Sequence, residues 1–306
     1  MLEFKKLELT DKERLEPYLA HDGSIMADRT FAALYIWRDY YDLQICFKDD
    51  FVYFLSKKHE GDRSYYMPLD MGGGDIEKAF CEIERDSRDK GLPYRVYLVT
   101  EEIKERLESE CPGKYTFLDD RNNYDYIYKA SDLMELKGKK FHSKRNHINR
   151  FTSVYAGRWS YENVDPKKHI TPIYDYTIKW GEAKRGDGYQ DDYKHELEAI
   201  SCALRNYEAL GMRGGVLYVD GQVAAYTLAA MTHNKVIDVM FEKADSDIDG
   251  AYTMINNQFA INNFSDIELV NREEDMGIQG LRTAKLSYNP VSLTKKYIAM
   301  PAKEIL

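Results

Sequence analysis

The chain has 306 residues, of which 43% are hydrophobic and 31% charged, and its formal net charge is −9. This length is more than one hydrophobic core usually serves, and the globular composition excludes disordered and fibrous classes, so two domains are expected. The negative net charge excludes a protein that binds nucleic acid or an anionic membrane with its whole surface. No stretch approaches the roughly 20 apolar residues that cross a bilayer, and the first residues lack a signal-peptide core, so we expect a cytoplasmic protein.

Residues 1–136 alternate helical and extended patterns and predict a first α/β domain. Between residues 43 and 55, two β-rich runs flank Lys48, Asp49 and Asp50, which predicts a hairpin. The other predicted elements are helices over 11–19, 30–41 and 75–91, a strand over 94–100, a helix beginning at Glu101, and two strands ending at Tyr128.

Residues 137–306 predict a second α/β domain that repeats this style without repeating the residues. Its central feature is a hairpin over 215–231, because Asp220 and Gly221 form a strong turn signal between two apolar runs. The other predicted elements are helices over 170–184 and 193–210, a strand over 236–242, a helix over 253–264, a strand over 267–271, a polar segment over 280–288 and a strand over 293–300.

A basic segment, residues 137–150, opens the second domain with six Lys or Arg, two His and no acid. At helical spacing Phe141, Ile148 and Tyr155, with Phe151, form an apolar stripe, which leaves Lys144 and its basic neighbours facing outward or into a cleft. Such a helix can hold the phosphates of a nucleotide, a tRNA backbone or a lipid headgroup. The alternative is a solvated basic face paired with the acidic body.

The strand over 236–242 carries two acids. Side chains alternate along a strand, so Asp238, Met240 and Glu242 are expected on one face of the sheet. A carboxylate on a sheet covered by helices can line a cavity and accept a proton from an attacking amine. The alternative is that this face of the sheet is exposed to solvent and that its acids have no catalytic role.

The next segment, residues 245–251, opens a helix. Its three Asp residues resemble the start of an EF-hand loop, but Asn256 stands where a bidentate Glu is required, so we expect no metal. Gly250 and Ala251 can let backbone amides at the helix start approach a pyrophosphate. Against this, the acids would repel that anion, and Asp249 can simply cap the helix.

Residues 271–290 are dense in polar groups between two predicted strands. Arg282 and Lys285 lie one helical turn apart, so both can point at one anion, and Tyr288 can return a proton to a leaving group. The alternative is a surface loop with salt bridges. The candidate substrate-binding residues of this segment are Glu273, Asp275, Arg282 and Lys285.

Four features together resemble the family named after the C-terminal domain of phosphatidylglycerol lysyltransferase, a tandem pair of GNAT folds related to Fem-type aminoacyltransferases. They are the runs TFAALYIWRDYY, KGKKFHSKRNHINRF and NREEDMGIQGLRTAKLSYNP, and the order hairpin, strand, Gly-Ala, helix. The resemblance implies two GNAT-like domains, 1–136 and 137–306, each with a mixed, mostly antiparallel sheet flanked by helices. The last run differs from that of the full lysyltransferases, and the chain looks more like a stand-alone branch without their membrane-spanning half.

By this likeness the donor lies where the central strands of the second domain splay apart, beside the helix that begins near Gly250 and Ala251, and the first domain is a degenerate copy. In the lysyltransferases the donor is an aminoacyl-tRNA and the acceptor a lipid hydroxyl. The residues implied in phosphate contacts are Lys139, Lys140, Lys144 and Arg145.

The sequence therefore predicts an acyl- or aminoacyl-transferase that uses an acyl-CoA or an aminoacyl-tRNA and an amine or hydroxyl acceptor, such as a lipid headgroup or a small molecule. Glu242 or Asp238 would act as the base and Tyr288 as the acid, with no tightly bound cofactor and no metal. The alternative hypothesis is a non-catalytic GNAT-like module that binds RNA or anionic lipid through the basic segment.

Overall fold

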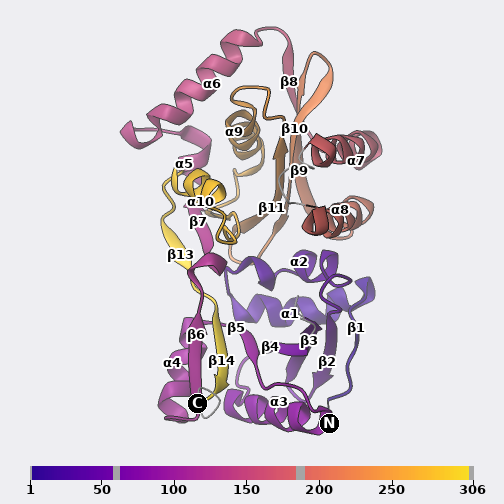
Figure 1. Ribbon diagram of the computed structural model, residues 1–306, viewed down its shortest axis with the longest axis vertical. Coiled ribbons are helices and arrows are strands. Elements are labelled where there is room, and N and C mark those ends of the chain that lie inside the picture. The colour runs from indigo at the N-terminus through magenta and orange to yellow at the C-terminus, as the bar shows by residue number, and fades with distance from the viewer. Residues whose placement is uncertain (1, 58–62, 184–189, 303–306) are drawn as a thin grey trace. The chain divides into compact units, whose positions relative to one another are not determined.

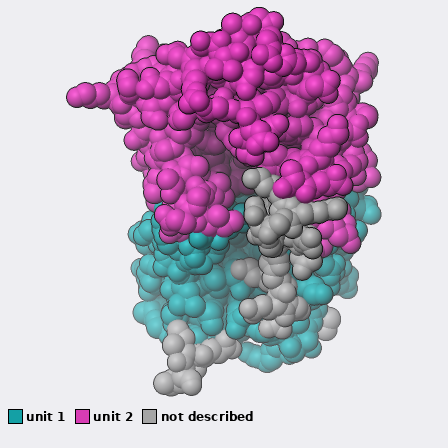
Figure 2. All heavy atoms as spheres, turned by 45° about the horizontal axis from the view of Figure 1, so that its top comes forward, with its two compact units in different colours: residues 1–125, 274–277, 294–306 teal, residues 126–273, 278–293 magenta. Residues whose placement is uncertain are grey.

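The computed structural model describes residues 2–57, 63–183 and 190–302. The chain divides into two compact units, which Figure 2 colours separately. Unit 1 comprises Met1–Asp125, Glu274–Gly277 and Thr294–Leu306, and unit 2 comprises Tyr126–Glu273 and Ile278–Leu293. Within the described residues, each unit holds a seven-stranded mixed sheet with helices packed on it (Figure 1), which confirms the predicted α/β (α+β) class.

Unit 1 has the strand order β1-β2-β3-β4-β5-β14-β6, in which β4 and β5 are parallel. Helices α2 and α3 begin at side-chain caps: Thr30 accepts from the amide of Ala33 at α2, and Asp75 accepts from that of Lys78 at α3. The helix predicted over 30–41 already ends at Ile36, where the chain turns toward β2. The elements are β1 (Lys5–Lys6), η1 (Leu9–Asp11), α1 (Lys12–Asp22), η2 (Ala27–Arg29), α2 (Phe31–Ile36), β2 (Gln44–Lys48), β3 (Phe51–Lys57), β4 (Arg63–Asp70), α3 (Ile76–Lys90), β5 (Val96–Val99), α4 (Glu101–Glu110), β6 (Tyr115–Asp119), η3 (Arg121–Asn123) and β14 (Tyr297–Pro301).

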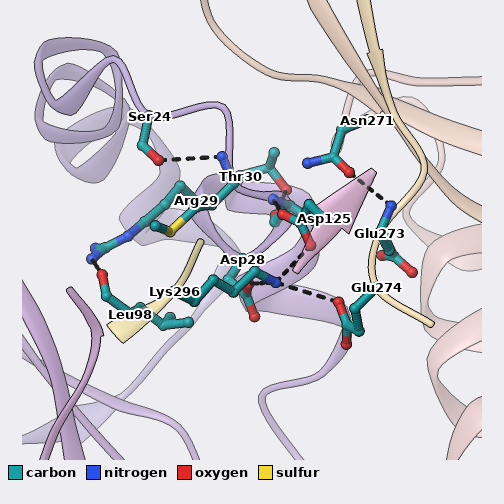
Figure 3. A network of polar contacts seen from close by, with 12 residues as sticks. Ser24, Asp28, Arg29, Thr30, Leu98, Asp125, Asn271, Glu273, Glu274 and Lys296 are labelled. Carbon is teal, nitrogen blue, oxygen red and sulfur yellow. Dashed lines mark hydrogen bonds and ion pairs between the residues drawn. The ribbon is translucent and has the colours of Figure 1, made fainter. Parts of the chain in front are cut away.

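Lys296, just before β14, is fixed in unit 1 by three carboxylates (Figure 3). Its ammonium lies 2.5 Å from Asp28, 2.7 Å from Asp125 and 3.3 Å from Glu274, and its side chain is only 7% exposed. Burial raises the pKa of Asp125 to about 6 against the pull of Lys296. Burial acts in the same sense on Asp28, but there the Lys296 ammonium prevails and lowers the pKa.

Unit 2 has the strand order β13-β7-β12-β11-β10-β9-β8, in which β11 and β12 are parallel. The predicted hairpin over 215–231 is confirmed, because β9 and β10 pair across a turn whose Asp220 and Gly221 both have positive φ. The elements are β7 (Asp125–Lys129), α5 (Ala130–Glu135), η4 (Lys139–Phe141), α6 (His142–Val154), β8 (Trp159–Asn163), α7 (Pro166–Ala183), α8 (Gln190–Arg205), β9 (Met212–Val219), β10 (Gln222–Met231), β11 (Val236–Ala244), α9 (Ala251–Asn263), β12 (Leu269–Asn271), α10 (Gln279–Leu286) and β13 (Ser292–Thr294).

The division of the chain differs from the boundary expected at residue 136. Strand β7 precedes that boundary, yet it pairs with β12 in the sheet of unit 2. Strand β14, expected in the second domain, pairs with β5 and β6 in the sheet of unit 1. Both differences arise from strand pairings between segments far apart in the sequence.

In unit 2, helix α9 covers one face of the sheet, and α7 and α8 cover the other (Figure 1). The pairing of β11 with β12 covers three residues, from Val236 opposite Leu269 to Asp238 opposite Asn271. Beyond Asp238, β11 runs on to Ala244 while β12 has ended. The end of β11 therefore lies beside α9 without β12 as its neighbour.

Candidate functional site

A β-bulge in β11 separates the two predicted acids. Against β10, Val239 pairs with Ala229 and Phe241 with Leu228, so Met240 is an extra residue. Before the bulge Ile237 and Val239 pack with α9, and after it Ala244 does so. The prediction that Asp238 and Glu242 share a face is therefore wrong, because the inserted residue reverses the alternation.

Glu242 consequently faces α9 and anchors two other side chains. One carboxylate oxygen lies 2.9 Å from Nη2 of Arg272, and the other accepts a hydrogen bond of 3.1 Å from Nδ2 of Asn256. The Glu242 and Arg272 side chains are 12% and 13% exposed. Asp238, which is completely buried, lies on the opposite face, toward α7 and α8.

Two polar atoms of this arrangement remain without a hydrogen-bond partner among the described residues. They are Nη1 of Arg272 and Oδ1 of Asn256, and both are buried. The amide nitrogen of Asn256 is fixed by Glu242, which orients Oδ1 away from that carboxylate. Since buried polar atoms in folded proteins are normally hydrogen-bonded, this pair offers one donor and one acceptor to a ligand.

Tyr288 and Lys144 complete the site. The Lys144 ammonium lies 3.8 Å from the centre of the Tyr288 ring, and the Arg272 guanidinium lies 4.9 Å from it. Burial raises the pKa of Tyr288 to about 12, although Arg272 and a hydrogen bond with Thr253 oppose the rise. We call Glu242, Arg272, Asn256, Tyr288 and Lys144 the Glu242 cluster.

The Lys144 ammonium is perturbed by the same neighbours. Burial, followed by repulsion from Arg272, lowers the pKa of Lys144 to about 8, and the negative charge of Glu242 acts in the opposite sense. With two cations and one carboxylate, the Glu242 cluster carries a net positive charge at neutral pH. It can therefore stabilise an oxygen atom that gains negative charge during a reaction.

Lys285 holds the segment that carries Arg272. Its buried ammonium donates to the carbonyl oxygens of Arg272 and Glu273, the latter at 3.2 Å. Tyr128 donates to the carbonyl of Lys285 at 2.8 Å and so ties α10 to the sheet. The sequence predicted that Arg282 and Lys285 point together at one anion. Instead, the Lys285 ammonium donates to backbone carbonyls, and Arg282 is partly buried on α10.

The acids of the same segment also have structural contacts. Glu273 has a positive φ, and its amide donates to Oδ1 of Asn271 at 2.7 Å. Asp275 belongs to unit 1, where it is fully buried, 3.3 Å from Arg121, and accepts from the amide of Gly277 at 2.9 Å.

The basic segment forms η4 and most of α6, with Phe141 and Phe151 fully buried as the apolar stripe predicts. Of its cations, Lys140 lies 2.7 Å from Asp132, and Arg145 donates to the carbonyls of Leu136 and Gly138. Lys139 is exposed, whereas Lys144 points into the Glu242 cluster. Of the four residues implied in phosphate contacts, three therefore have contacts within unit 2, and Lys139 is exposed.

Helix α6 also covers the start of α9. Gly250 has φ +85°, and a Cβ atom there would lie 2.9 Å from the carbonyl oxygen of His147 and 3.2 Å from Cβ of Phe151. The residue before Gly250, Asp249, lies 2.9 Å from Arg150 of α6. The residue after it, Ala251, is buried. Gly250 is thus required by the packing of α6 on the start of α9. Helix α6 therefore occupies space beside Gly250, where the sequence predicted a pyrophosphate.

Arg272 and Asn256 were not predicted from the sequence. Arg272 immediately follows β12, the point at which the two parallel strands separate, and this position was the available signal. Asn256 was considered only as a missing calcium ligand. In the described parts of the chain, no group of three or more His, Cys, Asp or Glu is placed to hold a metal, and no helix is long and apolar enough to cross a membrane.

Comparisons with known proteins identify relatives over most of the chain. A family model described as phosphatidylglycerol lysyltransferase, C-terminal, matches residues 24–300. A crystal structure of a conserved protein of unknown function from Bacteroides thetaiotaomicron is 37% identical, with a TM-score of 0.91 over 98% of this chain and 100% of that chain. An uncharacterized protein of Mycoplasmoides gallisepticum is 23% identical over 57% of this chain and 55% of its own length, so the chain spans about half the length of this curated relative.

Two more distant structures show the fold. One is the C-terminal domain of a protein named as a lysylphosphatidylglycerol synthetase from Agrobacterium fabrum, 12% identical, with a TM-score of 0.63 over 95% of this chain and 92% of that chain. The other is a tandem GNAT protein from the clavulanic acid biosynthesis pathway, 11% identical, with a TM-score of 0.52 over 99% of both chains. The predicted tandem GNAT fold is confirmed.

Proposed function

The chain belongs to the family of phosphatidylglycerol lysyltransferase C-terminal domains, and on this premise we propose that it is an acyl- or aminoacyl-transferase whose reaction takes place at the Glu242 cluster. One observation carries the proposal: Glu242 holds Arg272 and Asn256 so that a buried donor, Nη1, and a buried acceptor, Oδ1, are left for a ligand. A carbonyl group beside an amine or hydroxyl would satisfy both atoms.

The proposed reaction is direct transfer. The nitrogen or oxygen of the acceptor attacks the carbonyl carbon of the donor, and Glu242 takes the proton that the acceptor loses. Arg272 and the Lys144 ammonium stabilise the oxyanion of the tetrahedral intermediate. The bond between the acyl carbon and the carrier then breaks, Tyr288 gives its proton to the leaving group, and the proton held by Glu242 restores Tyr288.

Tyr288 suits the acid role because its pKa of about 12 is close to that of an alcohol leaving group, and it keeps its proton at neutral pH. Glu242 suits the base role because each carboxylate oxygen still has a lone pair after binding Arg272 or Asn256. Asp238 has no part in this scheme, since it lies on the other face of the sheet.

For the donor, we propose an aminoacyl ester such as an aminoacyl-tRNA in preference to a CoA thioester. Helix α6 packs on Gly250 at the start of α9, and Asp245, Asp247 and Asp249 are unfavourable neighbours for a pyrophosphate. The acceptor is an amine or a hydroxyl. The non-catalytic alternative is less favoured, because Lys140, Arg145 and Arg150 of the basic segment already have partners.

The test is a transfer assay with two donors, a mixture of radiolabelled aminoacyl-tRNAs and labelled acetyl-CoA, each with lipid vesicles or amines as acceptors. Loss of label from the donor is followed alongside the product, so that turnover is detected whichever acceptor is used. We expect Glu242→Gln and Arg272→Met to lower turnover by about 100-fold or more. Glu268→Gln, which removes an exposed carboxylate paired with Lys235 in the same unit, is the control and should behave as wild type.

The donor that is consumed decides between aminoacyl and acyl transfer. Consumption of neither donor by the wild-type protein would contradict the proposed reaction. Equal turnover by Glu242→Gln, Arg272→Met and the wild type would show that the reaction takes place elsewhere.

A further inference from the structure

A pocket of about 500 Å³ lies beside α7 in unit 2, outside the Glu242 cluster. Its walls come from α7, from the turn between β9 and β10, and from the loop that follows β11. We call it the α7 pocket. Its volume is in the range of pockets that bind small molecules in proteins.

Aromatic and acidic side chains are prominent in the lining of the α7 pocket. The aromatic ones are Tyr176, Trp180 and Tyr218, and the acidic ones are Asp175, Asp245 and Asp247. Among the residues that the structure describes, Lys179 is the basic residue of the lining, and these charged lining residues sum to −2. Carboxylates beside aromatic rings favour a ligand that is cationic and partly apolar, because ammonium groups are attracted both to the charges and to the ring faces.

The aromatic side chains are held in place by their polar ends. The Tyr176 hydroxyl donates to the carbonyl of Ala224 at 2.9 Å, and the Trp180 indole donates to that of Ala244 at 3.0 Å. Burial raises the pKa of Tyr176, so its hydroxyl stays neutral. The Lys243 ammonium lies 4.1 Å from the centre of the Trp180 ring, so one face of that ring is already occupied. The two side chains offer their remaining ring surface to the pocket rather than further donors.

The α7 pocket and the Glu242 cluster adjoin the same end of β11, the pocket on the side of α7 and the cluster on the side of α9. Asp245 of the pocket follows Glu242 by three residues, and Trp180 is bound to the carbonyl of Ala244 between them. Tyr252, on the first turn of α9, hydrogen-bonds with Trp180, and burial together with the negative charge of Glu242 raises its pKa. Tyr252 thus lies near both the pocket and the carboxylate.

We propose that the α7 pocket binds the cationic part of the acceptor, and that the acceptor is a small molecule with at least two amino groups rather than an anionic phospholipid. This inference rests on the proposed function. One ammonium group stays charged in the pocket. A second, neutral amine of the same molecule passes Tyr252 at the edge of β11, beyond the end of β12, and so reaches the cluster on the other side of the sheet. There it forms the C–N bond, its proton passes to Glu242, and the carrier leaves with the proton of Tyr288.

The first experiment measures binding alone, by isothermal titration calorimetry with putrescine, cadaverine, spermidine and agmatine. We expect at least one of them to bind, with affinity that falls as NaCl is raised, and we expect 1-pentanol and phosphatidylglycerol vesicles neither to bind nor to compete. The variant Asp175→Asn with Asp247→Asn should weaken binding at least tenfold. Its control, Glu135→Gln with Glu268→Gln, also removes two exposed carboxylates from unit 2 and should stay within twofold of wild type.

Absence of binding by all four amines, equal loss in the control variant, or displacement of the amine by the vesicles would overturn the proposal. Glu242→Gln separates this result from the proposed function, because it should abolish transfer and leave amine binding intact. Amine binding without transfer by the wild type would leave the α7 pocket standing and contradict the function. Transfer by the wild type that none of the amines supports or inhibits would leave the proposed function standing and contradict the proposed role of the α7 pocket.

Discussion

Replacing Gly250 by Ala tests whether this glycine serves helix packing. The residue has φ +85°, and an added Cβ would lie 2.9 Å from the backbone oxygen of His147 and 3.2 Å from Cβ of Phe151. A left-handed backbone costs a non-glycine residue about 1–2 kcal/mol. Forcing a methyl group against packed backbone adds about 1–3 kcal/mol. We therefore expect Gly250→Ala to lower the free energy of unfolding by about 2–5 kcal/mol in total.

The assay is urea unfolding of Gly250→Ala beside Gly211→Ala. Gly211, also in unit 2, has φ +66°, and a Cβ added there meets no atom within 4 Å, so this variant isolates the backbone cost. The two variants should differ by about 1–3 kcal/mol, the part due to α6. Equal unfolding free energies would refute the packing argument. If the two unfolding free energies were equal and Gly250→Ala also lost donor binding, the hypothesis that Gly250 contacts a phosphate would be favoured again.

Three further predictions concern buried lysines. Glu242→Gln should lower the pKa of Lys144 below about 8, because the negative charge of Glu242 stabilises the ammonium and the variant lacks it. NMR titration of methylated lysines would show an unchanged or higher pKa if this is wrong. Lys285→Met should lower the unfolding free energy by about 1–3 kcal/mol by leaving two buried carbonyls without their donor, and unchanged urea unfolding would contradict it. Lys296→Met should cost about 3–5 kcal/mol at pH 7. Lys296 holds the folded-state pKa of Asp125 down to about 6, so without it burial should raise that pKa further. As the pH falls from 7 toward 6 the folded variant then takes up a proton that the folded wild type does not, so the cost should shrink over this window and level off below about pH 6; a cost independent of pH would contradict the ion-pair account.

Much of the fold could be predicted because its signals are local. The turn at Asp220 and Gly221, the capped start of α3 and the apolar stripe of α6 each depend on residues close in sequence. The place of β14 could not be predicted in this way. Its position depends on pairing with β5 and β6, and on Lys296 meeting Asp28 and Asp125, which are far away in the chain.

The candidate site shows the same limit at the scale of one residue. Alternation along β11 predicted both acids on one face and gave no partner for either, because the bulge at Met240 reverses the facing of every later side chain. The hydroxyl of Thr227, buried on β10, donates to the carbonyl of Phe241 at 3.0 Å beside this bulge, a contact between strands that no periodicity within β11 contains. The bulge turns Glu242 toward Asn256 and Arg272 while Asp238 stays on the other face. A pair of acids at even spacing was therefore the wrong signal for this site, and the useful one was a single acid near the point where β11 and β12 separate.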